Sequence, residues 1–225
     1  MPTPRSILAA ASSASVLVFA PPAGAATVTT DPCVRTVSLS SLMNMPITGA
    51  GFTPGGRVTV RYATKVSPQP TFLTAVTADA AGNFTTAVTP PLFNKFNTQE
   101  QTFSLGAFDE SNPALVATTT WKQVRVGYIT NPPTGKPTRS ATHTVRGFPV
   151  GKATYLHFRF GGKTRRNVRL GVTSAPCGKV SRRLDLLPTR SRPGKWTVYV
   201  DQAKAYHKGT RPQLKYSFVI TRTFG

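Results

Sequence analysis

The chain carries GFTPGGRVTVRY at residues 51–62 and GFPVGKATYLHF at residues 147–158. The two stretches align without a gap at an offset of 96 residues. The alignment continues to a second shared turn, where Gly82 corresponds to Gly178. Self-similarity at a fixed offset is the signature of a structural unit that occurs more than once. We therefore expect this chain to contain the same unit twice.

Both copies have the periodicity of β-strands. Leu156 and Phe158 alternate with polar residues, as do Val58 and Val60 in the first copy, which is the period of a strand with one buried face. The 20 Pro and 18 Gly are spread along the chain, as expected when turns separate short strands. Roughly seven short strands in a unit of about 85 to 100 residues is typical of an immunoglobulin-like sandwich. The expected fold is all-β, with two tandem immunoglobulin-like β-sandwich domains after a signal peptide.

The first copy also resembles a known family. It reads TGAGFTPGGRVTV at residues 48–60 and VTADAAGNFT at residues 76–85. This pattern resembles the repeat of secreted actinobacterial immunoglobulin-like domains and is distantly similar to apoproteins of the neocarzinostatin type. The resemblance implies a β-sandwich and secretion. Neocarzinostatin-type apoproteins hold a chromophore in a cleft closed by disulfides inside one domain, whereas this chain has no cysteine pair within either copy.

The repeat predicts four parts: a signal peptide at residues 1–26, a first domain at 27–126, a Pro-rich linker at 127–141 and a second domain at 142–225. Arg5, the apolar stretch from Ile7 to Ala20 and the small residues at 23–25 are the three parts of a secretory signal. The apolar stretch is shorter than the roughly 20 residues of a membrane-spanning helix, so we expect no transmembrane segment in the mature chain. The expected location is secreted or cell-surface. Three prolines predict an extended and fairly stiff linker.

Positive charge is concentrated in the second half of the chain. The formal net charge is +21; residues 1–133 contain eight Lys and Arg against five acids, and residues 134–225 contain twenty against Asp185 and Asp201. A single-sign field of this size attracts polyanions and speeds their encounter. For an exported protein we expect anionic envelope or extracellular polymers, such as teichoic acids or other anionic glycans, and no sequence-specific nucleic acid, because no DNA- or RNA-reading motif is present. The alternative is a solvated basic surface that keeps a secreted protein soluble.

The strand pattern locates this charge on one hairpin. If Gly161-Gly162-Lys163 is a three-residue loop, Phe160 lies opposite Thr164, and the outward-facing pairs are Arg159 with Arg165, His157 with Asn167 and Tyr155 with Arg169. Like charges directly opposite each other destabilise a sheet, and the aligned face of the first copy is nearly neutral. The candidate anion-binding residues are therefore Tyr155, His157, Arg159, Lys163, Arg165 and Arg169.

The two cysteines, Cys33 and Cys177, lie in different copies. Export to an oxidising compartment favours a disulfide between them, and such a bond would hold the two domains together. The alternatives are two unpaired thiols or a bond to another molecule.

The sequence carries no pattern typical of catalysis or metal binding. His143, His157 and His207 are the only histidines, and none has a carboxylate or a second histidine at the spacing of metal ligands. A nucleophile elbow and a phosphate-binding glycine loop are both missing from the sequence. We expect no enzymatic activity, no catalytic residue, no metal and no cofactor. The predicted function is an exported, non-catalytic protein that binds anionic polymers through its basic second domain. The alternatives are a small-molecule carrier apoprotein and a structural or adhesive module, and the sequence specifies neither a ligand nor an oligomeric state.

Overall fold

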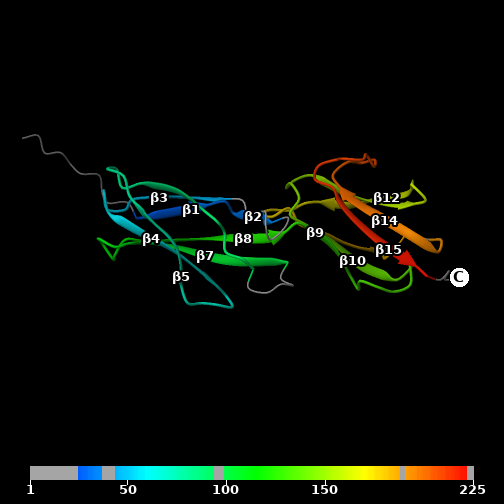
Figure 1. Cartoon of the computed structure of the whole chain (residues 1–225), viewed down its shortest axis with the longest axis horizontal. Coiled ribbons are helices and arrows are strands. Elements are labelled where there is room, and N and C mark those ends of the chain that lie inside the picture. Colours follow the sequence, from blue (N-terminus) through cyan, green and yellow to red (C-terminus); the bar gives the residue numbers. More distant parts are fainter. Residues whose placement is uncertain (1–24, 37–43, 94–98, 188–190, 222–225) are drawn as a thin grey trace, which may run out of the picture.

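The computed structural model describes residues 25–36, 44–93, 99–187 and 191–221. Every regular element in these ranges is a β-strand, which confirms the predicted all-β class. Figure 1 shows two β bodies placed end to end, the first built from β1 to β8 and the second from β9 to β15. Within the described residues no helix could cross a membrane. Almost all of the predicted signal peptide lies outside the described residues.

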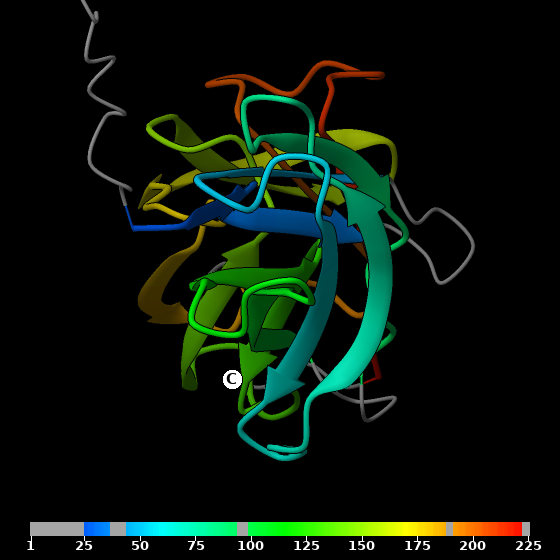
Figure 2. The ribbon, with the colours of Figure 1, turned by 90° about the vertical axis from the view of Figure 1, so that its left-hand side faces the viewer.

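The first domain is a sandwich of two sheets, and Figure 2 views the molecule from the end that this domain forms. One sheet has the order β1-β3-β6, with bounds Thr27–Thr30, Met45–Ala50 and Phe84–Val88. The other has the order β2-β8-β7-β4-β5, with bounds Cys33–Thr36, Val116–Arg125, Glu100–Asp109, Arg57–Thr64 and Thr71–Thr77. Strand β2 runs parallel to β8, and the other pairs are antiparallel.

The second domain repeats this plan with one strand fewer. Its first sheet has the order β13-β10-β9, with bounds Val180–Asp185, Ser140–Arg146 and Gly127–Asn131. Its second sheet has the order β12-β11-β14-β15, with bounds Lys163–Val172, Ala153–Phe160, Gly194–Asp201 and Leu214–Ile220. The fold is therefore two tandem immunoglobulin-like sandwiches, as the sequence predicts.

The shared turns have the same geometry in both copies. The N–H of Phe52 donates to the carbonyl of Gly82 at 3.0 Å, and the N–H of Phe148 donates to the carbonyl of Gly178 at 3.3 Å. Gly82 and Gly178 have φ values of 78° and 62°, a region that side chains with a Cβ rarely adopt. A Cβ on Gly82 would lie 2.3 Å from the Phe52 carbonyl oxygen, and one on Gly178 would lie 1.5 Å from that of Phe148. Both turns therefore require glycine.

The second domain begins earlier than the sequence predicts. Residues 127–131 form β9, which pairs with β10 from Gly127 opposite Arg146 onward. Strand β1 pairs with β3 from Thr27 opposite Ala50, and Ala50 corresponds to Arg146 in the repeat, so β9 is the counterpart of β1. The prediction that all of residues 127–141 form a linker is therefore wrong. The prolines obscured this strand, but they follow it and leave its backbone N–H groups available.

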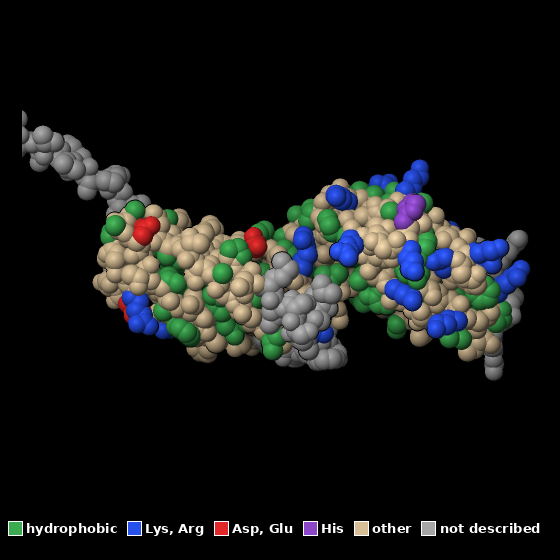
Figure 3. All heavy atoms as spheres, turned by 45° about the horizontal axis from the view of Figure 1, so that its top comes forward, with side chains coloured by type: hydrophobic (Ala, Val, Ile, Leu, Met, Phe, Trp, Pro, Cys, Tyr) green, Lys and Arg blue, Asp and Glu red, His purple; other side chains and the backbone are tan. Residues whose placement is uncertain are grey.

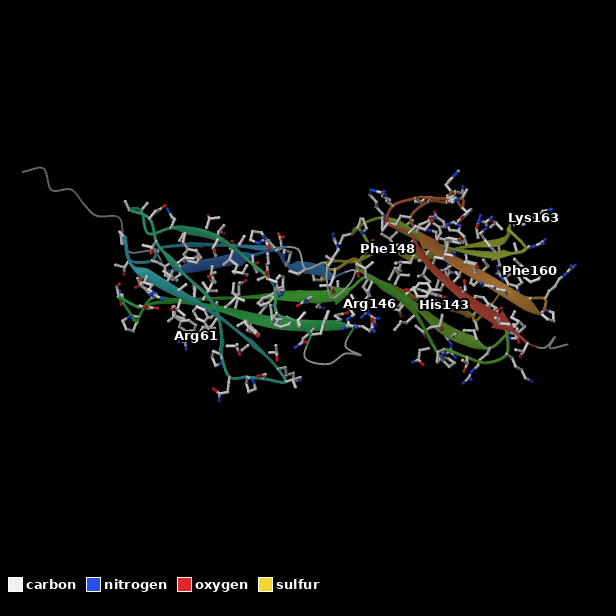
Figure 4. All side chains as sticks on the ribbon, viewed as in Figure 1. Arg61, His143, Arg146, Phe148, Phe160 and Lys163 are labelled. Carbon is white, nitrogen blue, oxygen red and sulfur yellow. A yellow bond between two sulfur atoms is a disulfide. The ribbon has the colours of Figure 1, made fainter. Side chains whose placement is uncertain are left out.

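Each core contains a packed pair of large aromatic side chains. In the first domain Phe103 stacks on Trp121 at a centroid distance of 4.7 Å. In the second domain Trp196 packs against Phe160 at 5.0 Å. The second core also contains His143, which is fully buried and labelled in Figure 4.

His143 is held in the core by two hydrogen bonds. Its Nε2 donates to the carbonyl of Asp185 at 3.0 Å, and its Nδ1 lies 2.7 Å from the Tyr128 hydroxyl. Burial lowers the pKa of His143, although the bond to the Asp185 carbonyl acts in the opposite direction. Burial and the neighbouring Tyr216 raise the pKa of Tyr128. The neutral ring therefore accepts from the neutral phenol, and the pair is a structural element of the core.

Two kinds of contact hold the domains together. Cys33 on β2 forms a disulfide with Cys177, with the two Cα atoms 5.3 Å apart. Beside it, the Glu100 carboxylate accepts from Lys122 at 2.9 Å and lies 3.5 Å from Arg146 and 3.7 Å from Lys179 of the second domain. Figure 4 shows Arg146 at this junction.

The environment of Glu100 lowers its pKa. Burial alone would raise the pKa, but the hydrogen bond and charge of Lys122, with the charges of Lys179 and Arg146, outweigh it. One acid of the first domain therefore neutralises cations of the second, at the junction between them.

Candidate anion-binding surface

The hairpin that carries the predicted site is tighter than expected. Phe160 pairs with Lys163, so Gly161 and Gly162 alone form the loop. Both glycines have positive φ, 57° and 74°, the conformation of a two-residue hairpin turn that matches the twist of its strands. The prediction of a three-residue loop with Phe160 opposite Thr164 is therefore wrong. The structure places Lys163 at the exposed tip of the hairpin (Figure 4).

A β-bulge then restores the predicted register. Tyr155 lies opposite Arg169 and His157 opposite Asn167, as the sequence predicts, but Arg159 lies opposite Thr164. The register shifts between Phe158 and Arg159, and Arg165 is the extra residue of β12. A bulge leaves its extra residue without a direct partner. The predicted opposition of Arg159 and Arg165 therefore does not form, and the sheet avoids that like-charge pair.

The outer face of β11 is covered, which corrects the predicted role of His157. Its ring has no exposed surface. Nε2 donates to Oδ1 of Asp201 at 2.9 Å, and Nδ1 lies 2.8 Å from Oδ1 of Asn167. The Tyr206 ring, from the loop between β14 and β15, packs edge-on against it at 6.0 Å. His157 is therefore a buried structural residue, and the half-buried Tyr155 stacks beside it with the ring centroids 6.4 Å apart.

Asp201 is the residue of this cluster that the sequence did not reveal. It is fully buried, and its carboxylate also accepts from the Ala203 N–H at 2.9 Å and the Gln213 side chain at 2.8 Å. Buried charges in proteins are normally paired and hydrogen-bonded. Asp201 is 44 residues from His157, so the pair arises only when β14 lies beside β11 and could not be recognised from local spacing.

Arg159 is also engaged within the protein. Its guanidinium carbon lies 4.1 Å from the centre of the Tyr206 ring and 5.8 Å from that of Tyr199, and the same group donates to the Gly162 carbonyl. A guanidinium over an aromatic face is attracted by the electron density of the ring. Arg159 is half-buried and fastens the covering loop. Arg159 is therefore not one of the freely exposed cations that could bind an anion.

The remaining cations of β12 and β13 are exposed and are here called the basic ridge. It consists of Lys163, Arg165, Arg166 and Arg169 on β12, and Arg182 and Arg183 on β13. The Arg182 guanidinium donates to the Arg169 carbonyl at 2.8 Å, which joins the edges of the two sheets. Within the described ranges, no carboxylate forms an ion pair with any of these six side chains. Figure 3 shows Lys and Arg side chains gathered over the second domain.

Three members of the ridge were missed by the sequence prediction. Arg166 alternates with the outward residues of β12, and Arg182 and Arg183 belong to a strand of the other sheet. The adjacent arginines at 182 and 183 are visible in the sequence, but their proximity to β12 depends on how the sheets meet. The corresponding region of the first domain exposes the apolar Phe72 on β5, 61% of its surface.

Across the ranges that the structure describes, no group of three or more His, Cys, Asp or Glu side chains is arranged to hold a metal ion. His157 and Asp201 do form a hydrogen-bonded pair. Both are inaccessible to solvent, so the pair does not face a substrate.

Comparison with known proteins gives structural likenesses only. No family model matches the chain, and no curated protein matches it in sequence. A tetra-tandem repeat from the extending region of a large adhesion protein is 13% identical with a TM-score of 0.29, covering 86% of this chain and 49% of that one. The ligand-binding domain of human OSCAR is 11% identical with a TM-score of 0.34, covering 87% and 97%. This chain thus spans about half the length of the adhesion-protein structure. The fold assignment rests on the strand pairing of the chain itself.

Proposed function

We propose that this chain is an exported, non-catalytic immunoglobulin-like protein that binds anionic polymers through the basic ridge of its second domain. The observation that carries the proposal is the ridge itself. Six cationic side chains are exposed on two adjoining strands, and the described residues provide them with no anionic partner. Such a field lowers the cost of bringing several negative charges to one surface.

The arrangement favours a polymer over a single small anion. Residues of a strand advance about 3.3 Å each, and exposed cations recur along β12 from Lys163 to Arg169 and again on β13. A row of cations can contact successive charges of one chain, whereas tight binding of one small anion requires several donors converging on one point. The hydrogen bond between Arg182 and the Arg169 carbonyl keeps the β13 cations beside those of β12. The ridge therefore fits an extended polyanion.

An exported protein meets the anionic polymers of the cell envelope and the extracellular matrix. Teichoic acids and other anionic glycans are therefore the expected ligands, and nucleic acid is expected to bind without sequence preference. Because phosphate contacts release condensed counterions, affinity for such polymers falls steeply as salt rises.

The test compares two triple charge reversals with equal change in net charge. The ridge variant is Arg165→Glu, Arg169→Glu and Arg183→Glu. The control variant is Lys136→Glu, Lys195→Glu and Lys215→Glu, three exposed cations outside β12 and β13. Arg159 is left unchanged, because its contact with Tyr206 is part of the fold. Fluorescein-labelled inorganic polyphosphate is titrated with each protein at several salt concentrations, and anisotropy is recorded.

Wild type is expected to bind with a steep inverse dependence on salt. The ridge variant is expected to lose at least about tenfold in affinity and two to three units of the logarithmic salt slope, by loss of about three phosphate contacts. The affinity of the control variant should stay within about twofold of the wild-type affinity, because only the overall field of the protein changes. Equal loss in both variants would show that net charge alone drives binding, and would overturn the ridge as a site. Melting temperatures of all three proteins establish that the comparison is between folded chains.

A further inference from the structure

The second domain lacks the strand that closes one edge of the first. In the first domain β2 adds to β8 in parallel, from Cys33 opposite Lys122 to Thr36 opposite Arg125. Val34 and Thr36 are only 7% and 5% exposed, so their side chains fill the edge of the sandwich. Strand β15 is the counterpart of β8, and in the described part of the chain its sole strand neighbour is β14. Among the described residues, the edge of β15 that corresponds to the β2 side of β8 is therefore open.

Proline diverts the segment that would otherwise close this edge. Two residues lead from β1 to β2 in the first domain, whereas β9 is followed by Pro132 and Pro133, with Pro137 four residues later. Proline has no N–H to contribute to a ladder. The Pro137 carbonyl instead accepts from the Leu187 N–H at 3.0 Å. The segment therefore turns toward the stretch after β13 and does not pair with β15.

An apolar groove remains between this segment and β15. Its cavity has a volume of about 530 Å³ and is lined by residues of β9, by residues 133–135 with Pro137, and by β15. The core residues Phe158 and Val198 also reach it. At its rim Ile129 and Val219 are 39% and 65% exposed. Pro and most charged residues are missing from β15, although these are the usual means of protecting a sheet edge.

The backbone of β15 directs hydrogen-bond donors toward this groove. In the first domain the Lys122 N–H donates to the Pro32 carbonyl at 3.0 Å, at the start of β2. Trp121 and Phe218 are counterparts, because each pairs with a buried aromatic residue of the neighbouring central strand. Val219 therefore corresponds to Lys122, and its N–H faces the open edge.

We propose that this groove binds an extended segment of a partner protein, which adds to β15 as a parallel strand. The partner segment carries small or β-branched side chains at two alternating positions, as Val34 and Thr36 do in β2. It carries an acidic residue between them, because the exposed Lys195 pairs with Val219 at this edge. Main-chain bonds supply affinity and alternate side chains supply selectivity in this mode of recognition. The proposal is independent of polymer binding at the ridge.

The probe is a fluorescein-labelled peptide with the sequence of residues 30–36, in which Cys33→Ser removes the thiol and Arg35→Glu supplies the acid. Its control carries Val34→Asp in addition. Binding to the full mature chain is measured by anisotropy in about 0.3 M salt, which screens non-specific attraction. We expect saturable binding of the probe and at least about tenfold weaker binding of the control, because an inward apolar side chain has been lost.

Two variants at one position separate strand addition from simple filling of the cavity. Val219→Pro removes the N–H that faces the groove, whereas Val219→Thr retains it. Proline is tolerated on an edge strand where the N–H faces solvent, so both variants should fold. We expect Val219→Pro to lower the affinity for the probe about tenfold, because one hydrogen bond is lost and the backbone around it is distorted. The affinity of Val219→Thr should stay close to that of wild type.

Three outcomes would overturn the proposal. The first is no binding of the probe at millimolar peptide. The second is equal affinity of the two Val219 variants for the probe. The third is an apolar dye that binds both variants equally and is not displaced by the probe, which would identify the groove as a small-molecule cavity. Circular dichroism and melting of both variants exclude unfolding as the cause of any loss.

Discussion

Nε2 of His157 lies 2.9 Å from Oδ1 of Asp201, and neither side chain has any exposed surface. This pair fastens the loop between β14 and β15 to the outer face of β11, since Asp201 also accepts from Ala203 and Gln213 of that loop. A face that is open in a simple sandwich is thereby covered in the second domain.

Removing one member of this pair should destabilise the second domain strongly. We expect His157→Leu to cost about 3 kcal/mol of unfolding free energy, because it leaves a buried carboxylate without its main partner. The double variant with Asp201→Asn should cost less than the two single variants together, since residues in one hydrogen-bond network are coupled. Chemical denaturation of the four proteins measures the cycle. Strict additivity would show that the two side chains act independently.

Loss of the disulfide should uncouple the domains. The bond joins residues 144 positions apart, and closing a loop of this length is worth about 4 to 5 kcal/mol in the chain-entropy treatment. We expect the double variant Cys33→Ser and Cys177→Ser to melt at a lower temperature and in two resolved calorimetric transitions. A single transition at the wild-type temperature would contradict this expectation.

Replacement of Glu100 should have an effect that depends on pH. The pKa of Glu100 is lowered in the folded protein, so its stabilisation is fully present above the unfolded value of about 4.3. It is lost as pH falls through the lower folded pKa. We expect Glu100→Gln to cost about 1 kcal/mol at neutral pH, as a partly exposed ion-pair network does.

Urea denaturation of wild type and Glu100→Gln at pH 7 and pH 3 checks this dependence. The difference in unfolding free energy should be smaller at the lower pH, because protonation of the wild-type carboxylate removes the charge that the substitution also removes. A difference that stays constant with pH would indicate that packing of the side chain, and not its charge, is responsible.

Substitution by alanine should destabilise the protein more at Gly178 than at Gly151. A Cβ at position 178 would lie 1.5 Å from the Phe148 carbonyl oxygen, whereas one at Gly151 meets no atom within 4 Å. Both residues have positive φ, so Gly151→Ala should cost about 1 to 2 kcal/mol from backbone strain alone. Gly178→Ala should cost considerably more or prevent folding. Thermal melts of the two variants give the comparison, and equal losses would mean that the turn relaxes to admit the side chain.

The repeat was the part of the fold that the sequence predicted well. Glycine positions report backbone geometry directly, and the matched turns at Gly82 and Gly178 have the same hydrogen bond and similar φ. The alternation in β11 likewise predicted that Tyr155 faces Arg169 and His157 faces Asn167. These features are local, so a short stretch of residues determines them.

The errors have separate physical causes. His157 is buried because it contacts Tyr206 and Asp201. Both residues belong to a polar stretch of sequence that shows no strand or helix periodicity, so these contacts could not be predicted. The bulge at Arg165 depends on whether two or three residues form the turn, and Gly161-Gly162-Lys163 is compatible with either. Strand β9 was mistaken for linker because composition was averaged over a segment that contains both a strand and prolines.

The bond between Cys33 and Cys177 also fixes the edge strand β2 to the segment between β12 and β13 of the second domain. β2 is a four-residue strand that closes the first sandwich, and such a short strand has few hydrogen bonds of its own. Reduction of the disulfide would thus weaken the attachment of β2 to the first sandwich. The same step would allow the second domain to move relative to the first. In a reducing milieu the edge of β8 would then become accessible as that of β15 already is, and self-association through these two edges would follow.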